Sequence, residues 1–217
     1  MSALVLVIGN KAYSSWSLRP WLLMRHSGIA FDEVRISLYS DGAKQNLLRH
    51  SPSGRVPVLE DGDLRVWDSL AICEYLAEKY PEKQLWPADF KARAQARAIS
   101  AEMHSGFGQL RAQMPMNVRR EFPRRIVPAE VATDIGRIEA IWNACRAQHE
   151  ARGPFLFGAF SIADAMFAPV VSRLRTYGVP VGGAAQQYAR EMYALPAMHE
   201  WIGGARAETE INPQYET

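Results

Sequence analysis

Hydrophobic and polar residues change their spacing several times within the first 80 positions. Residues 3–8 form a nearly continuous apolar run with β-branched side chains, which indicates a strand buried on both faces. Residues 16–27 repeat apolar side chains at helical spacing, and Gly28 ends the predicted helix. Residues 31–38 alternate between apolar and polar and predict a second strand. Two strands joined by a helix imply a right-handed βαβ unit with parallel strands.

The following segment combines a short helix, a hairpin and a longer helix. A polar helix is predicted around residues 42–49. Residues 56–67 contain two apolar runs on either side of Asp61-Gly62, which is a strong signal for an antiparallel hairpin. Residues 69–79 return to helical spacing. The resulting order, β-α-β-α-β-β-α, resembles the thioredoxin-like fold, a mixed sheet with helices on both faces.

The strand signal almost disappears in the second half of the chain. Residues 81–89 contain two prolines between helical patterns and predict a linker. We therefore expect a thioredoxin-like domain over residues 1–80 and an all-helical domain over residues 90–217. The helices expected in the second domain cover residues 90–113, 128–149, 162–176, 184–193 and 196–208.

Composition and charge exclude several classes of protein. The 217 residues are 48% hydrophobic and 22% charged, which is ordinary for a water-soluble globular protein with a real core. A net charge of only +2 gives no electrostatic basis for nucleic-acid binding, and no apolar run is long enough to span a membrane. Cys73 and Cys145 lie far apart and outside any metal-ligand spacing. We therefore expect buried reduced thiols, no metal site and a cytoplasmic location.

A thioredoxin-like domain followed by an all-helical domain resembles the cytosolic glutathione transferases, over essentially the whole chain. Thioredoxins carry a C-x-x-C pair at the start of the first helix, where the helix dipole stabilises a thiolate. Here the same place reads SSWS, residues 14–17, so the electropositive helix start has no sulfur. This arrangement suits a sulfur that arrives on a ligand, because a serine hydroxyl can stabilise the ligand thiolate by a hydrogen bond.

The pattern S-S-x-S-x-R, from Ser14 to Arg19, is similar to the S-S-C-x-x-R signature of the zeta class. That resemblance implies that Ser14 stabilises the glutathione thiolate, with Ser15 close by. Theta and delta relatives place the active serine four residues before the arginine, which selects Ser15, so we name both serines and place Ser14 slightly first. Trp16 replaces the zeta-class cysteine, and Tyr13 is a further candidate because other classes use a tyrosine. The serines also suit a simple helix cap, and Arg19 a structural contact.

The resemblance also assigns residues to the rest of glutathione. It implies that Pro57 is cis and that the Val56 backbone pairs with the bound peptide, although proline at the start of an edge strand also has a structural role. Asp68 and Ser69 precede the helix over 69–79, where free N–H groups and the dipole bind a carboxylate. Ser69 adds a hydroxyl and Asp68 can pair with the ammonium of the γ-glutamyl group, while both also serve as a helix cap.

Other candidates follow from the position of the cleft between the two domains. Lys44, Arg49 and Arg55 are weaker candidates for the glycyl carboxylate, and the sequence does not choose among them. The second substrate is expected between the domains, against the serines and the first long helix of the second domain. Methionine, aromatic and polar side chains there suit an adaptable pocket as well as ordinary helix packing. The predicted walls are Tyr13, Trp16, Met103, His104 and Phe107.

One further motif concerns folding. Residues 160–164 contain Ser161-x-x-Asp164, a capping box with Phe160 as a hydrophobic staple.

Three functions are consistent with the residues. The leading interpretation is a homodimeric glutathione transferase that activates the thiol of glutathione, its co-substrate, for attack on a small electrophile. The alternatives are a maleylacetoacetate-type isomerase that uses glutathione as a cofactor, and a non-catalytic protein that uses the same fold for binding.

Overall fold

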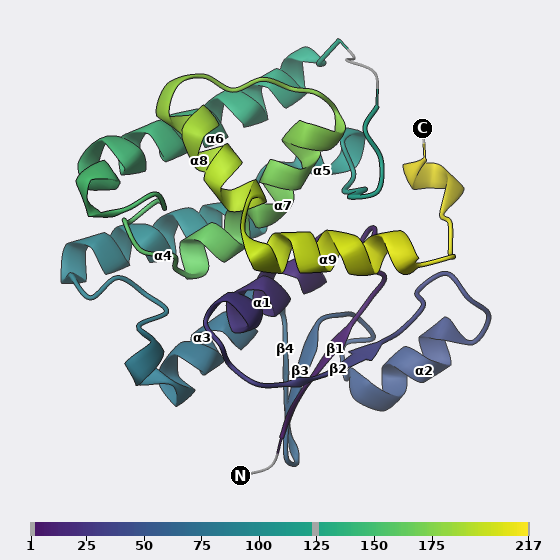
Figure 1. The fold of residues 1–217 in the computed structure, drawn as a ribbon. Helices are drawn as coiled ribbons and strands as arrows, with labels where there is room; N and C mark the ends of the chain where they lie inside the picture. The colour runs from purple at the N-terminus through teal and green to yellow at the C-terminus, as the bar shows by residue number, and fades with distance from the viewer. Residues whose placement is uncertain (1–2, 123–125, 217) are drawn as a thin grey trace.

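A four-stranded sheet with three helices forms the first part of the chain (Figure 1). The computed structural model describes residues 3–122 and 126–216. The elements in chain order are β1 (Leu4–Ile8), α1 (Ser15–His26), β2 (Asp32–Arg35), α2 (Ala43–His50), β3 (Val58–Asp61), β4 (Leu64–Trp67) and α3 (Ser69–Lys79). Their order confirms the predicted thioredoxin-like domain.

The sheet has the strand order β2-β1-β3-β4. β1 pairs with β2 in parallel and with β3 antiparallel, so its apolar run is explained by its interior position. β3 and β4 form the predicted hairpin, and Gly62 adopts a φ of 64° in the turn between them. β2 ends at Arg35, before residue 38, because the chain diverges toward the first loop, where Leu38 N–H donates to Asn10 Oδ1 at 2.9 Å.

Helices cover both faces of this sheet, as predicted. Four buried side chains form a small cluster beneath α2, on the face away from the second domain: Val7, Ile36, Leu47 and Val58. On the other face, α1 and α3 separate the sheet from the helical domain (Figure 1), and one continuous hydrophobic core joins the two domains. Trp21 of α1 packs edge-on against Trp201 with ring centroids 5.1 Å apart.

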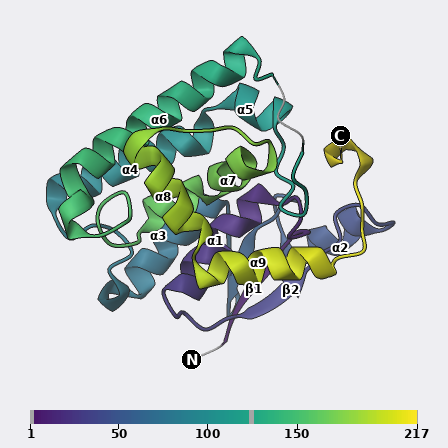
Figure 2. The same cartoon turned by 45° about the horizontal axis from the view of Figure 1, so that its top comes forward.

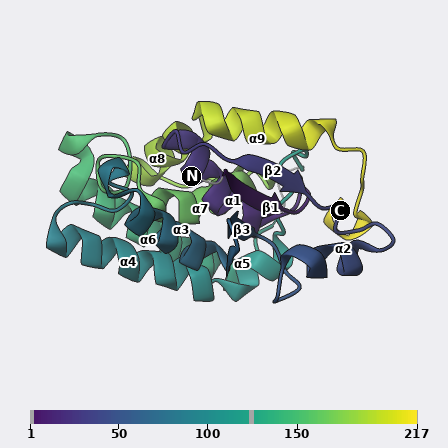
Figure 3. The same ribbon diagram turned by 90° about the horizontal axis from the view of Figure 1, so that it is seen from below.

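The second part of the chain contains α-helices and short 3₁₀ helices. The α-helices are α4 (Phe90–Ser105), α5 (Gly108–Gln113), α6 (Ala129–His149), α7 (Ile162–Thr176), α8 (Gly183–Tyr193) and α9 (Pro196–Ala207). The 3₁₀ helices are η1 (Pro81–Lys83), η2 (Glu150–Arg152) and η3 (Pro213–Tyr215). Figure 2 shows α7 in the middle of this domain, and it contacts α1, α4 and α8. After α9 the chain turns at the right of Figure 1 and leads to η3, and Figure 3 shows the same turn from below.

The single helix predicted over residues 90–113 is wrong, because the chain breaks between α4 and α5. Gly106 is extended, and Phe107 has a positive φ of 60°. A Cβ on Gly106 would lie 2.8 Å from the carbonyl oxygen of Glu102, so this position requires glycine. A residue distant in sequence fixes the start of α5, because the Leu110 N–H donates to Asp134 Oδ2 on α6 at 2.9 Å.

The predicted capping box is present at the start of α7. The backbone N–H and the hydroxyl of Ser161 donate to Asp164 Oδ2 at 2.8 and 3.0 Å. The Leu156 N–H donates to Asp164 Oδ1 at 3.0 Å, so one buried carboxylate also fixes the loop before the helix. Burial raises the pKa of Asp164 to about 6 despite these donors.

Replacing Asp164 with alanine removes this buried acceptor. The N–H groups of Leu156 and Ser161 then lose their partner, at about 1–3 kcal/mol each, so we expect the free energy of unfolding to fall by about 2–5 kcal/mol. Urea denaturation measures the change. Asp63→Ala, an exposed carboxylate in the hairpin turn, is the control and is expected to change stability by less than about 0.5 kcal/mol. Equal midpoints for Asp164→Ala and the parent would contradict the assigned role.

Candidate functional site

The serine loop, residues 9–17, connects β1 to the first turn of α1. Ser14 is the N-cap of α1 and accepts a hydrogen bond from Ser17 N–H at 3.4 Å. Its own hydroxyl donates to Ser17 Oγ at 2.8 Å. Ser17 Oγ also accepts the Gly9 N–H at 3.1 Å. The Ser14 hydroxyl is therefore already used inside the loop.

Ser15, the first residue of α1, differs from its neighbour in one respect. Both serines are 8% exposed and line the same cavity. Within residues 3–122 and 126–216, however, the Ser15 hydroxyl has no hydrogen-bond partner, whereas Ser14 has two bonds to Ser17. Ser15 thus holds a free hydroxyl at the positive end of a helix dipole.

Two adjoining cavities lie between the sheet domain and the helices α4 and α5. The serine cavity, lined by Ser14 and Ser15, has a volume of about 520 Å³. The helix-start cavity, at the beginning of α3, has a volume of about 490 Å³. Three residues line both cavities: Trp16, Arg55 and Val56. The two spaces therefore meet beside Trp16 and form one cleft.

Seven predicted residues line the helix-start cavity: Trp16, Arg55, Val56, Pro57, Asp68, Ser69 and His104. The Val56–Pro57 peptide is cis, and Val56 lies just before β3, outside its paired register. Asp68 caps α3, with its Oδ1 accepting two backbone N–H groups at 2.9 and 3.2 Å. Asp68 also has a φ of 78°, a conformation that costs a non-glycine residue roughly 1–3 kcal/mol and often marks a functional site. Ser69 is buried, and its Oγ accepts a bond from Arg19 Nη1 at 3.3 Å.

His104, on α4, contributes a side chain of the helical domain to this cavity. Its Nε2 lies 3.1 Å from Asp68 Oδ2, and its ring packs against Trp16 with centroids 5.2 Å apart. Burial lowers the pKa of His104, and this effect exceeds the opposite influence of Asp68. The predicted pocket histidine therefore lines the helix-start cavity.

Other predicted residues lie away from the cleft. Met103, on the buried face of α4, and Phe107, at the break after α4, belong to the hydrophobic core and line neither cavity. Lys44 and Arg49 are exposed on α2 and also line neither cavity. Of the three basic candidates, only Arg55 lies at the cleft.

The sequence reasoning missed several residues of the serine cavity: Tyr39, Arg111, Arg173 and Tyr215. A local signal existed for Arg173, which follows Phe167 and Val170 at intervals of three on a buried helix and so places a charge on an apolar stripe. The tyrosines gave no such signal. Tyr215 reaches the cavity only because the chain returns to it after α9.

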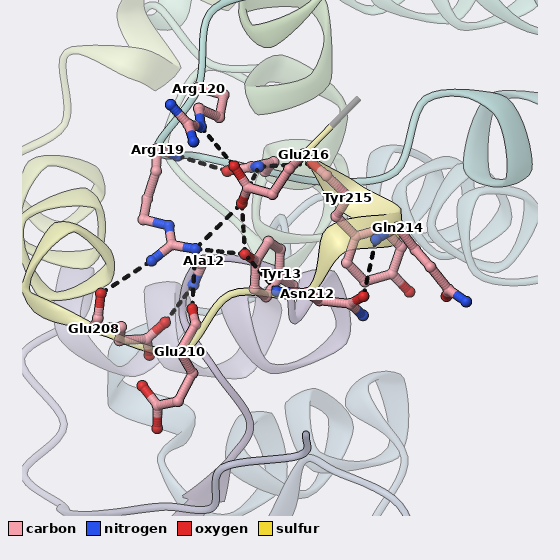
Figure 4. Close-up of polar contacts among 11 residues, drawn as sticks. Ala12, Tyr13, Arg119, Arg120, Glu208, Glu210, Asn212, Gln214, Tyr215 and Glu216 are labelled. Atoms are coloured by element: carbon pink, nitrogen blue, oxygen red, sulfur yellow. Dashed lines mark hydrogen bonds and ion pairs between the residues drawn. The ribbon is translucent and has the colours of Figure 1, made fainter. Parts of the chain in front are cut away.

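The 208–216 segment, which follows α9, binds the serine loop through hydrogen bonds and ion pairs (Figure 4). The Glu208 carboxylate accepts the N–H groups of Lys11 and Ala12 at 2.6 and 3.0 Å. Arg119 donates to the carbonyl oxygens of Glu208 and Glu210 at 3.0 and 3.1 Å. Residues about 200 positions apart in the chain therefore hold one another in place.

Tyr13 is fully occupied by this network. Its hydroxyl donates to Glu216 Oε1 at 2.6 Å and accepts bonds from Asn212 N–H, at 3.1 Å, and from Arg119 (Figure 4). Burial, followed by the bond to Glu216, raises the pKa of Tyr13, so the phenol keeps its proton at neutral pH. Tyr13 packs against Tyr215 with centroids 5.3 Å apart and so forms a wall of the serine cavity.

Both cysteines are buried free thiols, as expected, and neither lines the cleft. Burial raises the pKa of Cys73 and of Cys145, which keeps both thiols protonated at neutral pH. The part of the chain that the structure describes contains no cluster of histidine, cysteine and acidic residues suited to a metal ion. None of its helices has the length and hydropathy needed to cross a bilayer.

Two family models match the chain. The model of the glutathione S-transferase N-terminal domain matches residues 13–79, and that of the glutathione S-transferase C-terminal domain matches residues 94–204. The second match alone spans half of the chain. The protein therefore belongs to the glutathione S-transferase family.

Two individual relatives match part of the chain. "Glutathione S-transferase Z2" of Arabidopsis thaliana is 35% identical over 89 residues, 39% of this chain and 40% of that protein. "Probable maleylacetoacetate isomerase" of Caenorhabditis elegans is 37% identical over 97 residues, 44% of each chain. The chain thus spans about two fifths of these relatives. A glutathione transferase homolog from Burkholderia gl BGR1, solved with bound glutathione, is 24% identical with a TM-score of 0.71, covering 95% of this chain and 100% of that one. That similarity supports the fold.

Replacing Glu208 with alanine tests the hold of the 208–216 segment on the serine loop. The N–H groups of Lys11 and Ala12 lose their acceptor, so we expect the free energy of unfolding to fall by about 2–4 kcal/mol and amide exchange at these two residues to accelerate. The control Glu200→Ala removes an exposed pair with Arg25 and is expected to cost less than about 0.5 kcal/mol. Unchanged exchange in Glu208→Ala would contradict this role.

Proposed function

We propose that the protein is a glutathione transferase in which the Ser15 hydroxyl donates a hydrogen bond to the thiolate of bound glutathione. The observation that carries this proposal is the Ser15 hydroxyl, which lies at the start of α1 in the wall of the serine cavity and has no partner among the described residues. Ser14, placed slightly first on the sequence alone, already donates to Ser17 and serves as the cap. Its bonds support a structural role and favour Ser15 for chemistry.

The energy required of this arrangement is modest. A free thiol has a pKa of about 8.5, so half ionisation at pH 7 requires a decrease of about 1.5 units, or about 2 kcal/mol. A hydrogen bond to a charged group contributes about 1.5–3 kcal/mol, and a helix terminus adds about 0.3–1 kcal/mol. One serine hydroxyl at the first turn of α1 therefore suffices.

The helix-start cavity is suited to the rest of the tripeptide. We assign the Val56 backbone, before β3, to pairing with the peptide, and Ser69 with the start of α3 to the γ-glutamyl carboxylate. Asp68 is assigned to the ammonium and Arg55 to the glycyl carboxylate. The serine stabilises the thiolate of glutathione beside the second substrate. The thiolate attacks the electrophilic carbon of that substrate, and the protein forms no covalent intermediate.

Glutathione binding and conjugation test this function directly. We expect calorimetric titration to show binding at millimolar concentration or below, and an aromatic halide to be conjugated faster than in the absence of protein. Absence of binding at millimolar glutathione would reject the proposal. The homodimer expected from the family resemblance stays a prediction.

Alanine variants separate the two serines. Ser15→Ala is expected to raise the pKa of the bound thiol by about 1–2 units and to lower kcat/KM at pH 7 roughly 10- to 100-fold, because it removes the charge-assisted hydrogen bond. Ser14→Ala is the matched control: it should cost about 1 kcal/mol of stability through the lost cap, with a smaller change in the thiol pKa. The ultraviolet absorbance of the thiolate across pH gives the pKa. A larger shift in Ser14→Ala than in Ser15→Ala would reverse the assignment.

A second candidate function is a maleylacetoacetate-type isomerase. The pattern from Ser14 to Arg19 and the partial match to the Caenorhabditis elegans protein favour it, whereas Trp16 stands where the zeta-class signature has cysteine. In that reaction glutathione adds to a double bond and then leaves. Isomerisation with glutathione present in catalytic amounts would support the isomerase, and stoichiometric consumption of glutathione the transferase.

A further inference from the structure

The serine cavity carries an excess of positive charge. Three of its lining residues are the arginines Arg55, Arg111 and Arg173, and none of the described residues that line it is acidic. A pocket for a neutral, apolar electrophile does not need buried guanidinium groups, whose transfer out of water is costly unless they are paired.

Arg173, on α7, is the most deeply buried of the three. It is 3% exposed, and its Nε donates to the carbonyl oxygen of Met114 at 2.8 Å. Its Nη1 is buried and has no hydrogen-bond partner in the described part of the chain. An unpaired buried cation at the wall of an open cavity indicates a partner that the protein itself does not supply.

Arg111, on α5, is held in a similar way. Its Nε donates to the Gly106 carbonyl oxygen at 2.9 Å, and its Nη2 to those of Met103 and His104. No hydrogen bond forms between its Nη1 and any other described residue. Its guanidinium lies 4.9 Å from the ring centre of Trp16 and is thereby kept in the cleft. Neutral carbonyl groups thus hold the Nε of both arginines, and neither Nη1 has a hydrogen-bond partner among the described residues.

Among the described residues, no carboxylate forms an ion pair with Arg111 or Arg173. Asp134, which influences Arg111, accepts the N–H of Leu110 at 2.9 Å. Arg19 adds a further buried cation on Trp16, at 4.4 Å from the ring centre. Burial, followed by repulsion from Arg111, lowers the pKa of Arg173 to about 10, so the group remains protonated at neutral pH.

We propose that Arg111 and Arg173 bind a carboxylate on the electrophilic substrate, so that the enzyme prefers electrophiles bearing a carboxylate over neutral analogues. This inference rests on the proposed function and deepens it. The planar, forked guanidinium matches a carboxylate through two parallel hydrogen bonds. The two arginines come from the helical domain and lie in the serine cavity, whereas the residues assigned to the γ-glutamyl end of glutathione lie in the helix-start cavity.

A chlorodinitrobenzoate and its methyl ester provide the test, because they differ in charge at one position. In both reactions the thiolate forms the C–S bond and chloride leaves. For the parent we expect the ratio of kcat/KM for the acid to that for the ester, corrected for the uncatalysed rates, to exceed roughly tenfold. Arg111→Met should lower this ratio about tenfold or more. Arg173→Lys, which keeps the buried charge but removes the fork, should lower it less.

The matched control is Arg175→Met, on the same helix as Arg173 but half-exposed and paired with Glu121 at 2.8 Å. Its acid-to-ester ratio should equal that of the parent. An unchanged ratio in both Arg111→Met and Arg173→Lys would overturn the proposal. So would a rise in the KM of glutathione in Arg111→Met with no change in the ratio, because that result assigns the arginine to a carboxylate of glutathione itself.

Equilibrium binding separates this inference from the proposed function. Quenching of tryptophan fluorescence, with Trp16 in the cleft, reports binding of the acid and the ester in the absence of glutathione. Tighter binding of the acid, lost in Arg111→Met, supports the carboxylate site even if no conjugation is detected. Equal binding of acid and ester overturns it even if glutathione is bound and conjugated.

Discussion

The positions of the two serines in the cleft depend on the hydrogen bonds inside the serine loop. Ser17 Oγ accepts both the Gly9 N–H and the Ser14 hydroxyl, which ties the end of β1 to the first turn of α1. Asn10 adds a second restraint, because its carbonyl oxygen accepts the N–H of Ser14 at 2.8 Å. With Ser14 committed to the cap, Ser15 is the next residue that can present a hydroxyl to the cavity. The same serine-rich sequence thus provides one hydroxyl that caps the helix and one that lines the cavity without a partner among the described residues.

Local periodicity was sufficient for most of the fold. The buried strand over residues 3–8, the hairpin around Asp61-Gly62 and the capping box at Asp164 all depend on residues close in sequence, and the structure contains each of them. The predicted element boundaries were wrong where contacts between residues distant in sequence determine the local structure. Asp134 holds the start of α5, and Asn10 captures Leu38 after β2, and neither contact is visible in the local pattern.

The candidate site was predictable to the extent that the fold itself places residues. Ser15, Val56 and Asp68 follow strands or precede helices of a recognisable order, so they meet at one cleft. Met103 was assigned from its residue type and its place on the first long helix of the second domain, and it lies in the core. Arg173 contacts Met114, 59 positions away, and no pattern near either residue indicates that pairing. Side-chain chemistry in the cleft depends on such long-range contacts more than on sequence motifs.

The attachment of the 208–216 segment has a consequence for exchanging domains between relatives. The thioredoxin-like domain does not carry a complete cleft, because the N–H groups of Lys11 and Ala12 and the hydroxyl of Tyr13 bind residues that follow the whole helical domain. A chimera that joins this first domain to a foreign helical domain would separate the serine loop from its partners. The 208–216 segment and the first domain therefore form one structural unit. A chimera that keeps the serine loop intact must contain both.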